Sequence, residues 1–160
     1  MEQIEERLRP AEPLLPETFE ALYLAEYRSM VRLAFVMVEG SAEEVVQDAF
    51  ARIYERWGSI DRPRAYLRTC VVNGCRDVLR RRRLAVWRRP DPVPEVTELG
   101  ADHLLDALGA LTPRRRAAVV LRYYEDLSEA EIATVLGVRP GTVKSMLHRS
   151  LLQLRGVVER

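Results

Sequence analysis

Apolar residues along this chain recur every three or four positions, which is the spacing of one face of a helix. The clearest run extends from Ala42 to Trp57, and its polar residues fall on the opposite face. Ser41 and Glu44 stand at the start of this run with the spacing of a capping box. The pattern therefore predicts an amphipathic helix that begins after Ser41 and buries one side.

Two further helices are predicted, one on each side of this run. The first covers 18–38 and is ended by Gly40. The second covers 65 to about 83, after a break over 58–63 that contains glycine and proline. Three helices with such short connections predict one compact helical bundle.

The segment over 86–100 has three prolines, few periodic apolar residues and a change of charge sign, which predicts an extended linker. Beyond it leucines at helical spacing resume, and Thr112 and Pro113 have the order expected at a helix start. No segment alternates at strand spacing over a useful length. We therefore predict an all-α protein of two small helical domains joined by a flexible linker. The expected division is a mobile leader over 1–16, a first domain over 17–85, a linker over 86–100 and a second domain over 101–160.

Residues 127–151 have the order of a helix-turn-helix. Ser128 and Glu131 form a second capping box at the start of its first helix. Gly137 stands where the chain must reverse, and Pro140 occupies the first position of the second helix. An ordinary helical hairpin requires none of these signals, so their coincidence predicts a motif that reads double-stranded DNA.

The second helix of this motif has an apolar and a polar side. Small hydroxyls near its start and a basic residue one turn later suit a helix in a major groove. The side chains expected to point inward are Val143, Leu147, Leu151 and Leu154. The outward side carries Gly141, Thr142, Ser145, His148 and Arg149, with Lys144 and Met146 on its flanks.

Charge is unevenly distributed along the 160 residues, although the net formal charge is only +1. Residues 61–90 carry +8 and residues 111–160 carry +4, with −5 over 91–110 between them. Basic blocks of this kind commonly meet phosphate backbones, and a solvated surface is the alternative of similar weight. Nearly all of the positive charge is arginine, which favours bidentate phosphate contacts; a GC-rich genome is the alternative source of the same bias.

The sequence indicates no membrane segment, metal or cofactor. It has no apolar run of membrane-spanning length and no signal-peptide pattern at its start, so we expect a cytoplasmic protein without membrane insertion. Cys70 and Cys75 match no zinc, redox or disulfide spacing and are expected to be reduced and mostly buried. His148 has no second ligand at metal spacing.

Several runs closely resemble segments of the extracytoplasmic-function sigma factors of bacterial RNA polymerase. Residues 111–116, 121–133 and 141–145 resemble the family's C-terminal DNA-binding domain, as in Leu111-Thr112-Pro113, Glu131-Ile132-Ala133 and Gly141-Thr142-Val143-Lys144-Ser145. Residues 41–50 resemble its polymerase-binding helix and residues 73–83 its promoter-melting helix. The resemblance implies a sigma factor, not an enzyme, that binds the largest and second-largest subunits of core RNA polymerase and directs promoter recognition and transcription initiation.

Glu44, Gln47 and Asp48 are the residues that the resemblance assigns to polymerase binding. They stand at i, i+3 and i+4, so they form one patch on the outward side of the predicted helix. In the family this acidic and amide surface docks on a coiled coil of the largest subunit. Taken alone, the patch would also fit a solvated helix face.

Arg76, Arg80 and Arg83 stand at i, i+4 and i+7, a stripe that can track a phosphate backbone. In the family this helix and the loop before it capture the non-template strand of the minus-ten element as it opens. Tyr66 and Trp57 are nearby aromatics for base stacking, with a place in the core as the alternative. The expected minus-ten residues are Ser59, Asp61, Arg62, Asn73, Arg76, Asp77, Arg80 and Arg83.

The resemblance also assigns the minus-thirty-five element to the second helix of the motif, and two residues there depart from the family pattern. Arg139 replaces a common serine cap, at a cost of about 1 kcal/mol unless a phosphate contact offsets it. Met146 stands where arginine is common, which removes a basic contact from the expected base-reading surface. The expected minus-thirty-five residues are Arg139, Thr142, Lys144, Ser145, His148 and Arg149.

Other classes of DNA-binding protein fit the sequence less well. A recombinase or transposase needs a catalytic constellation that the sequence does not provide. A response regulator would place alternating strands and helices before the DNA reader, whereas residues 18–83 have helical periods. The alternative kept open is a stand-alone helix-turn-helix regulator that forms no holoenzyme. Because an anti-sigma factor often inhibits members of the family, we expect such a partner here.

Overall fold

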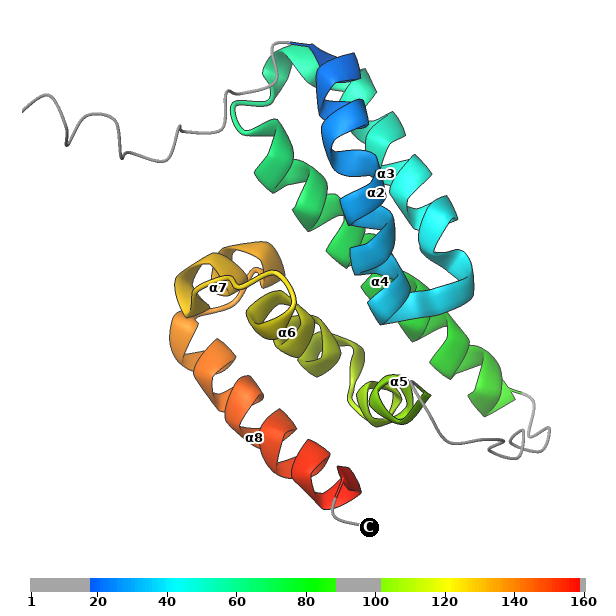
Figure 1. Ribbon diagram of the computed structural model, residues 1–160, viewed down its shortest axis with the longest axis vertical. Helices are drawn as coiled ribbons and strands as arrows, with labels where there is room; N and C mark the ends of the chain where they lie inside the picture. The colour runs from blue at the N-terminus through cyan, green and yellow to red at the C-terminus, as the bar shows by residue number, and fades with distance from the viewer. Residues whose placement is uncertain (1–17, 89–101, 159–160) are drawn as a thin grey trace, which may run out of the picture.

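The computed structural model describes residues 18–88 and 102–158, so the predicted leader over 1–16 and residues 89–100 of the predicted linker lie outside it. Within the described ranges every regular element is helical, which confirms the all-α prediction (Figure 1). The α-helices are α2 (Phe19–Val38), α3 (Ala42–Glu55), α4 (Pro63–Arg88), α5 (Asp102–Gly109), α6 (Pro113–Tyr123), α7 (Glu129–Leu136) and α8 (Pro140–Val158). Two short 3-10 helices are η1 (Glu39–Ser41) and η2 (Trp57–Ser59).

Helices α2, α3 and α4 form the predicted bundle (Figure 1). Their apolar stripes meet at a core that includes the fully buried Leu22, Leu33, Ile53, Leu67 and Val71. Each helix therefore has one face committed to packing, and the opposite face is left for other contacts.

Helix α4 extends to Arg88, beyond the end predicted near Arg83. The sequence has no glycine or proline between Gly74 and Pro90, and the residue before a proline is disfavoured in a helix. Nothing in the local sequence ends the helix earlier. Residues 86–88 consequently belong to α4 rather than to the linker.

The capping box predicted at Ser41 does not form. Ser41 is the last residue of η1, with φ −112° and ψ 11°, rather than the extended conformation of a capping residue. Its hydroxyl accepts a hydrogen bond from Arg82 Nη2 at 3.0 Å, and Arg82 Nη1 donates to the carbonyl of Val38 at 3.0 Å. The Arg82 guanidinium of α4 thus stabilises the connection between α2 and α3.

Helices α5 to α8, over 102–158, form a second helical unit beside the α2–α4 bundle, and this unit contains the predicted helix-turn-helix as α7 and α8. The Ser128 hydroxyl accepts from the N–H of Glu131 at 3.3 Å, and the Ser128 N–H donates to the Glu131 carboxylate at 2.8 Å. This confirms the second capping box. Gly137 has φ 63° and ψ 40°, a left-handed conformation that favours glycine at the turn.

The two helical units pack against each other (Figure 1). Helix α6 contacts both α2 and α4, and α7 contacts α4, so the buried apolar residues of both units form one continuous cluster. Polar contacts reinforce this boundary. Arg116 Nη1 donates to the carbonyl of Met37 at 2.7 Å, and Arg68 pairs with Glu125 at 3.0 Å.

Candidate nucleic-acid interface

The outward face of α8 is a polar surface at the edge of the molecule. All six residues predicted for the minus-thirty-five element, from Arg139 to Arg149, are exposed. The Arg139 carbonyl accepts the first helical hydrogen bonds, from the N–H groups of Thr142 and Val143, while its side chain remains at the surface. The start of α8 and the cationic side chains of its outward face are therefore both exposed to solvent.

Met146 lies on the buried side of α8, not on the flank where the sequence placed it. Val143 is fully buried, Met146 is 9% exposed and Leu147 is 7% exposed, whereas Leu151 reaches 36%. At 100° per residue, position 150 lies almost directly above position 143, and position 151 lies at the edge of the stripe. Ser150 takes the central place and donates to the Met146 carbonyl at 2.7 Å. The expectation that Met146 alters the base-reading surface is therefore wrong, because its side chain packs in the core.

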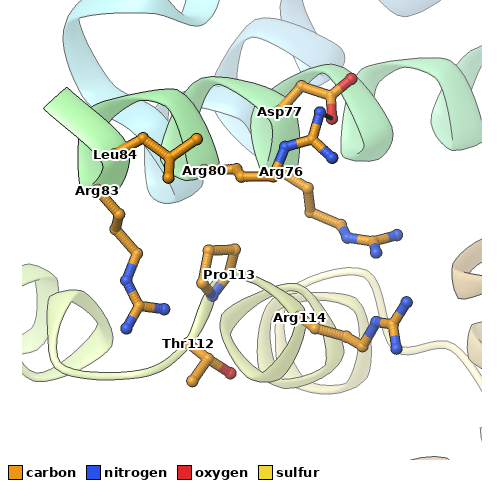
Figure 2. A pocket seen from close by; sticks show the side chains of 8 residues that line it. All are labelled: Arg76, Asp77, Arg80, Arg83, Leu84, Thr112, Pro113 and Arg114. Atoms are coloured by element: carbon orange, nitrogen blue, oxygen red, sulfur yellow. Dashed lines mark ion pairs between the residues drawn. The ribbon is translucent and has the colours of Figure 1, made fainter. Parts of the chain in front are cut away.

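The arginine stripe of α4 faces the start of α6 across a cavity of about 430 Å³. Figure 2 shows Arg76 and Arg83 extending from α4 toward Arg114 and Thr112, while Arg80 turns to Asp77. The Arg80–Asp77 pair measures 3.2 Å, and Arg76 also donates to the Asn73 side chain at 3.1 Å. The three arginines of the predicted stripe thus line one cavity, and a further cation, Arg114 of α6, lies opposite them.

Burial lowers the pKa of Arg76, and the positive charge on Arg114 lowers it further. Asp77 acts in the opposite direction, because a neighbouring carboxylate favours the charged guanidinium. Even so, the guanidinium remains charged at neutral pH, as arginines do in proteins. The cavity is therefore an electropositive site suited to an anion.

The loop before α4 forms a second cavity, of about 460 Å³. Ser59, Asp61 and Arg62 line it and are exposed, and Tyr66 contributes an aromatic wall. Trp57 instead packs edge-on against Phe19, with ring centroids 5.7 Å apart. Of the two aromatics singled out from the sequence, Tyr66 lines this cavity, and both are partly buried against the core. The cavity also contains Thr134 of α7.

Glu44, Gln47 and Asp48 are exposed on α3, opposite the buried Val46 and Ala49. Neither carboxylate forms an ion pair within the described residues, and both border a cavity that Arg52, Arg81 and Arg82 also line. The predicted patch is therefore one accessible surface on a helix that is fixed by its other face.

The chain is similar to known proteins in both sequence and fold. Residues 22–85 match the family model described as Sigma-70 region 2, and residues 102–154 match Sigma-70, region 4. The RNA polymerase sigma-E factor of Streptomyces coelicolor is 42% identical over 123 residues, which cover 71% of this chain and 70% of that protein. This chain belongs to the extracytoplasmic-function sigma factors. It binds core RNA polymerase and directs promoter recognition.

Other sigma factors support the same membership. The ECF RNA polymerase sigma factor SigL of Mycobacterium tuberculosis is 35% identical over 131 residues, covering 71% of this chain and 72% of that protein. In fold, the chain is similar to the sigma factor RpoE of Bartonella quintana, with a TM-score of 0.72 and 21% identity over 88% of this chain and 96% of that one. It is also similar to CnrH, with a TM-score of 0.65 and 25% identity over 88% and 87%.

Sequence reasoning missed the residues through which the two halves of this sigma factor meet. Arg116 and Glu125 were visible only as charges in basic and mixed runs, because their partners lie in the first helical unit. No helix among the described residues is long and apolar enough to span a membrane. In the same residues, no cluster of three or more acidic, histidine or cysteine side chains is placed to hold a metal ion.

Proposed function

We propose that this sigma factor divides its contacts among three separate surfaces, and that the residues named from the sequence form them. Glu44, Gln47 and Asp48 contact the coiled coil of the largest polymerase subunit. The loop over 59–62 and the arginine stripe of α4 bind the minus-ten element. The outward face of α8 reads the minus-thirty-five element.

The observation that carries this assignment is the position of the cationic and polar groups relative to the core. The buried face of α8 leaves all six predicted reading residues exposed on the other side. Helix α4 likewise buries Leu67, Val71 and Cys75 and presents its arginines on another face. Because the buried face fixes each helix, DNA binding requires ordering of the side chains but no rearrangement of the backbone that carries them.

The minus-ten contact is proposed to combine backbone and base recognition. Ser59, Asp61, Arg62 and Tyr66 surround a cavity that can accept an unstacked base, and the nearby arginines contact phosphates. In this mechanism binding energy separates the strands, and no covalent step is involved. We further propose that the protein acts in the cytoplasm and has an anti-sigma factor as partner. The similar RpoE structure is a complex with the anti-sigma factor NepR, and the CnrH structure is a complex with the cytosolic domain of CnrY.

The test is run-off transcription with purified core polymerase and genomic fragments, together with binding measurements on single variants. We expect Gln47→Ala and Asp48→Arg to weaken polymerase binding, with Glu20→Arg as a matched control because it reverses an exposed acidic residue on α2. Unchanged polymerase affinity in both α3 variants would refute the docking assignment.

The minus-thirty-five assignment is tested on the promoters found in this way. We expect Arg149→Ala to weaken binding of duplex promoter DNA, because it removes an exposed guanidinium from the reading face. Arg155→Ala removes the same charge from a different side of α8 and is the control. Equal losses in the two variants would show a general charge effect and no reading by Arg149.

A further inference from the structure

The spacing of a capping box occurs twice in this chain, with opposite outcomes. At the start of α7, the carboxylate of Glu131 accepts hydrogen bonds from the N–H of Ser128 at 2.8 Å and from its hydroxyl at 2.7 Å. At the start of α3, Ser41 and Glu44 have the same spacing, yet the Ser41 side chain makes no capping bond. The Glu131 carboxylate is thus bound to the start of its own helix, whereas that of Glu44 is not.

Arg82 of α4 accounts for this difference. Its Nη2 donates to the Ser41 hydroxyl at 3.0 Å, and its Nη1 donates to the Val38 carbonyl at 3.0 Å. Val38 is the last residue of α2, and the last turn of this helix has no basic residue of its own to bind the free carbonyls there. One guanidinium therefore satisfies a helix-end carbonyl and also binds the serine, and hydrogen bonds from a charged donor are stronger than neutral ones.

The backbone at Ser41 matches this arrangement. With φ −112° and ψ 11°, it differs from Ser128, which has φ −68° and ψ 159°, the extended conformation of a capping residue. A box at α3 would need Ser41 to become extended and its hydroxyl to bind the N–H of Glu44. The preceding residue is Gly40, and glycine permits such a change at little steric cost. The bond to Arg82 and the capping box therefore exclude each other.

A capping box would withdraw Glu44 from the surface proposed to bind polymerase. In a box the carboxylate folds back onto the N–H of the capping residue, as that of Glu131 does. In the structure the Glu44 carboxylate forms no ion pair within the described residues and is exposed, as is the neighbouring Asp48. The bond from Arg82 to Ser41 consequently leaves this carboxylate free to contact a partner.

We propose that Arg82 is a positioning residue for polymerase binding, and that it acts by keeping Ser41 from capping α3 together with Glu44. Loss of Arg82 lets the box form, and the helix then binds the carboxylate that polymerase would use. Arg82 belongs to the same bundle as the α2–α3 connection, so this bond does not depend on how the two helical units pack. The inference rests on the proposed docking role of Glu44, and its experiment tests the two separately.

The test measures the binding of variants of the full chain to core polymerase in the absence of DNA. We expect Arg82→Ala to bind about tenfold more weakly, the effect of losing one hydrogen bond to a charged group. Adding Ser41→Ala removes the hydroxyl that the box requires, so this double variant should return to within about twofold of the wild type. Arg82→Ala combined with Glu44→Ala should bind no more weakly than Glu44→Ala alone, because both changes remove the same contact.

Arg81→Ala is the matched control, because Arg81 lines the same cavity between α3 and α4 while the Ser41 hydroxyl bonds to Arg82. A loss in Arg81→Ala as large as that in Arg82→Ala would show that charge near the acidic patch, rather than the bond to Ser41, governs polymerase binding. Nuclear magnetic resonance gives a readout that a merely loosened connection would not move. A new Overhauser contact between the Ser41 amide proton and the Glu44 side chain should appear in Arg82→Ala.

Three results would overturn the inference. The first is wild-type polymerase affinity in Arg82→Ala while Glu44→Ala binds weakly. The second is an Arg82→Ala/Ser41→Ala protein that binds no better than Arg82→Ala. The third is the absence of the new contact between Ser41 and Glu44. Unchanged polymerase affinity in Glu44→Ala would instead refute the docking role of Glu44, and the magnetic resonance contact would still decide whether Arg82 prevents the box.

Discussion

Replacing Gly74 with alanine will destabilise the protein, although alanine is the better helix former. Gly74 lies in α4 where this helix packs on α3. A Cβ atom added there would lie 2.8 Å from Cγ1 of Val45, which is closer than such contacts occur in proteins. Val45 is 6% exposed and β-branched, so its methyl groups have little freedom to move aside within α3.

The sign of this effect follows from two opposing terms. Alanine gains about 1 kcal/mol over glycine in a helix interior. Forcing an extra methyl into a packed core costs about 1 to 3 kcal/mol. A cost of about 2 kcal/mol, the middle of that range, leaves a net loss of about 1 kcal/mol. Such a loss lowers the melting temperature of a chain of this size by roughly 3 °C.

The measurement is urea denaturation of four proteins that form a double-mutant cycle. Val45→Ala alone leaves a cavity and lowers the free energy of unfolding. In that background Gly74→Ala should become neutral or stabilising, because its methyl group now fills free space. A stabilisation of about 1 kcal/mol by Gly74→Ala in the wild-type background would refute the steric argument and leave helix propensity as the governing term.

Two further predictions concern the capping box and the cysteines. Ser128→Ala should lower the free energy of unfolding by about 1 kcal/mol at neutral pH, measured by urea denaturation. Hydrogen bonds from Ser128 lower the pKa of Glu131 below its ordinary 4.5, so the associated stability is present above that pH and is lost as the pH falls through the folded-state pKa. The Ser128→Ala protein should therefore lose less stability than the wild type on acidification, and parallel curves would contradict this linkage. Burial raises the pKa of Cys75 to about 12 and also raises that of the half-buried Cys70. Iodoacetamide at pH 8 should label Cys70 first and Cys75 only on unfolding, as read by peptide mass spectrometry, and equal labelling rates would show that Cys75 is accessible in the folded protein.

Much of the secondary structure followed from local signals in the sequence. Thr18, Thr112 and Ser128 cap the helices that they were expected to begin, and Gly137 has the left-handed conformation required of its turn. These signals are reliable because the side chain and the backbone group that it satisfies are only a few residues apart. The amphipathic pattern similarly located the exposed polar face of α3.

The structure differs from the sequence-based predictions where a residue far away in the chain decides the local conformation. Ser41 has the spacing of a cap, but its hydroxyl is taken by Arg82 from another helix. Met146 and Leu151 both suit a helix face, and only the position of the neighbouring helices determines which of them is buried. The packing of the two units on each other depends on pairs such as Arg68 and Glu125, which are 57 positions apart and have no joint signature in the sequence.

The four adjacent arginines over 80–83 do not share one environment, because Arg82 bonds to the connection between α2 and α3. In sequence, residues 80–83 form a uniform basic run, and Arg80 and Arg83 do line the cavity proposed for DNA. Arg82 instead bonds to Val38 and Ser41 at the turn that precedes α3, the helix proposed to bind polymerase. An alanine scan along this run would therefore combine two kinds of defect, one in promoter opening and one in assembly of the holoenzyme. Loss of transcription at neighbouring positions is thus no proof of a shared contact.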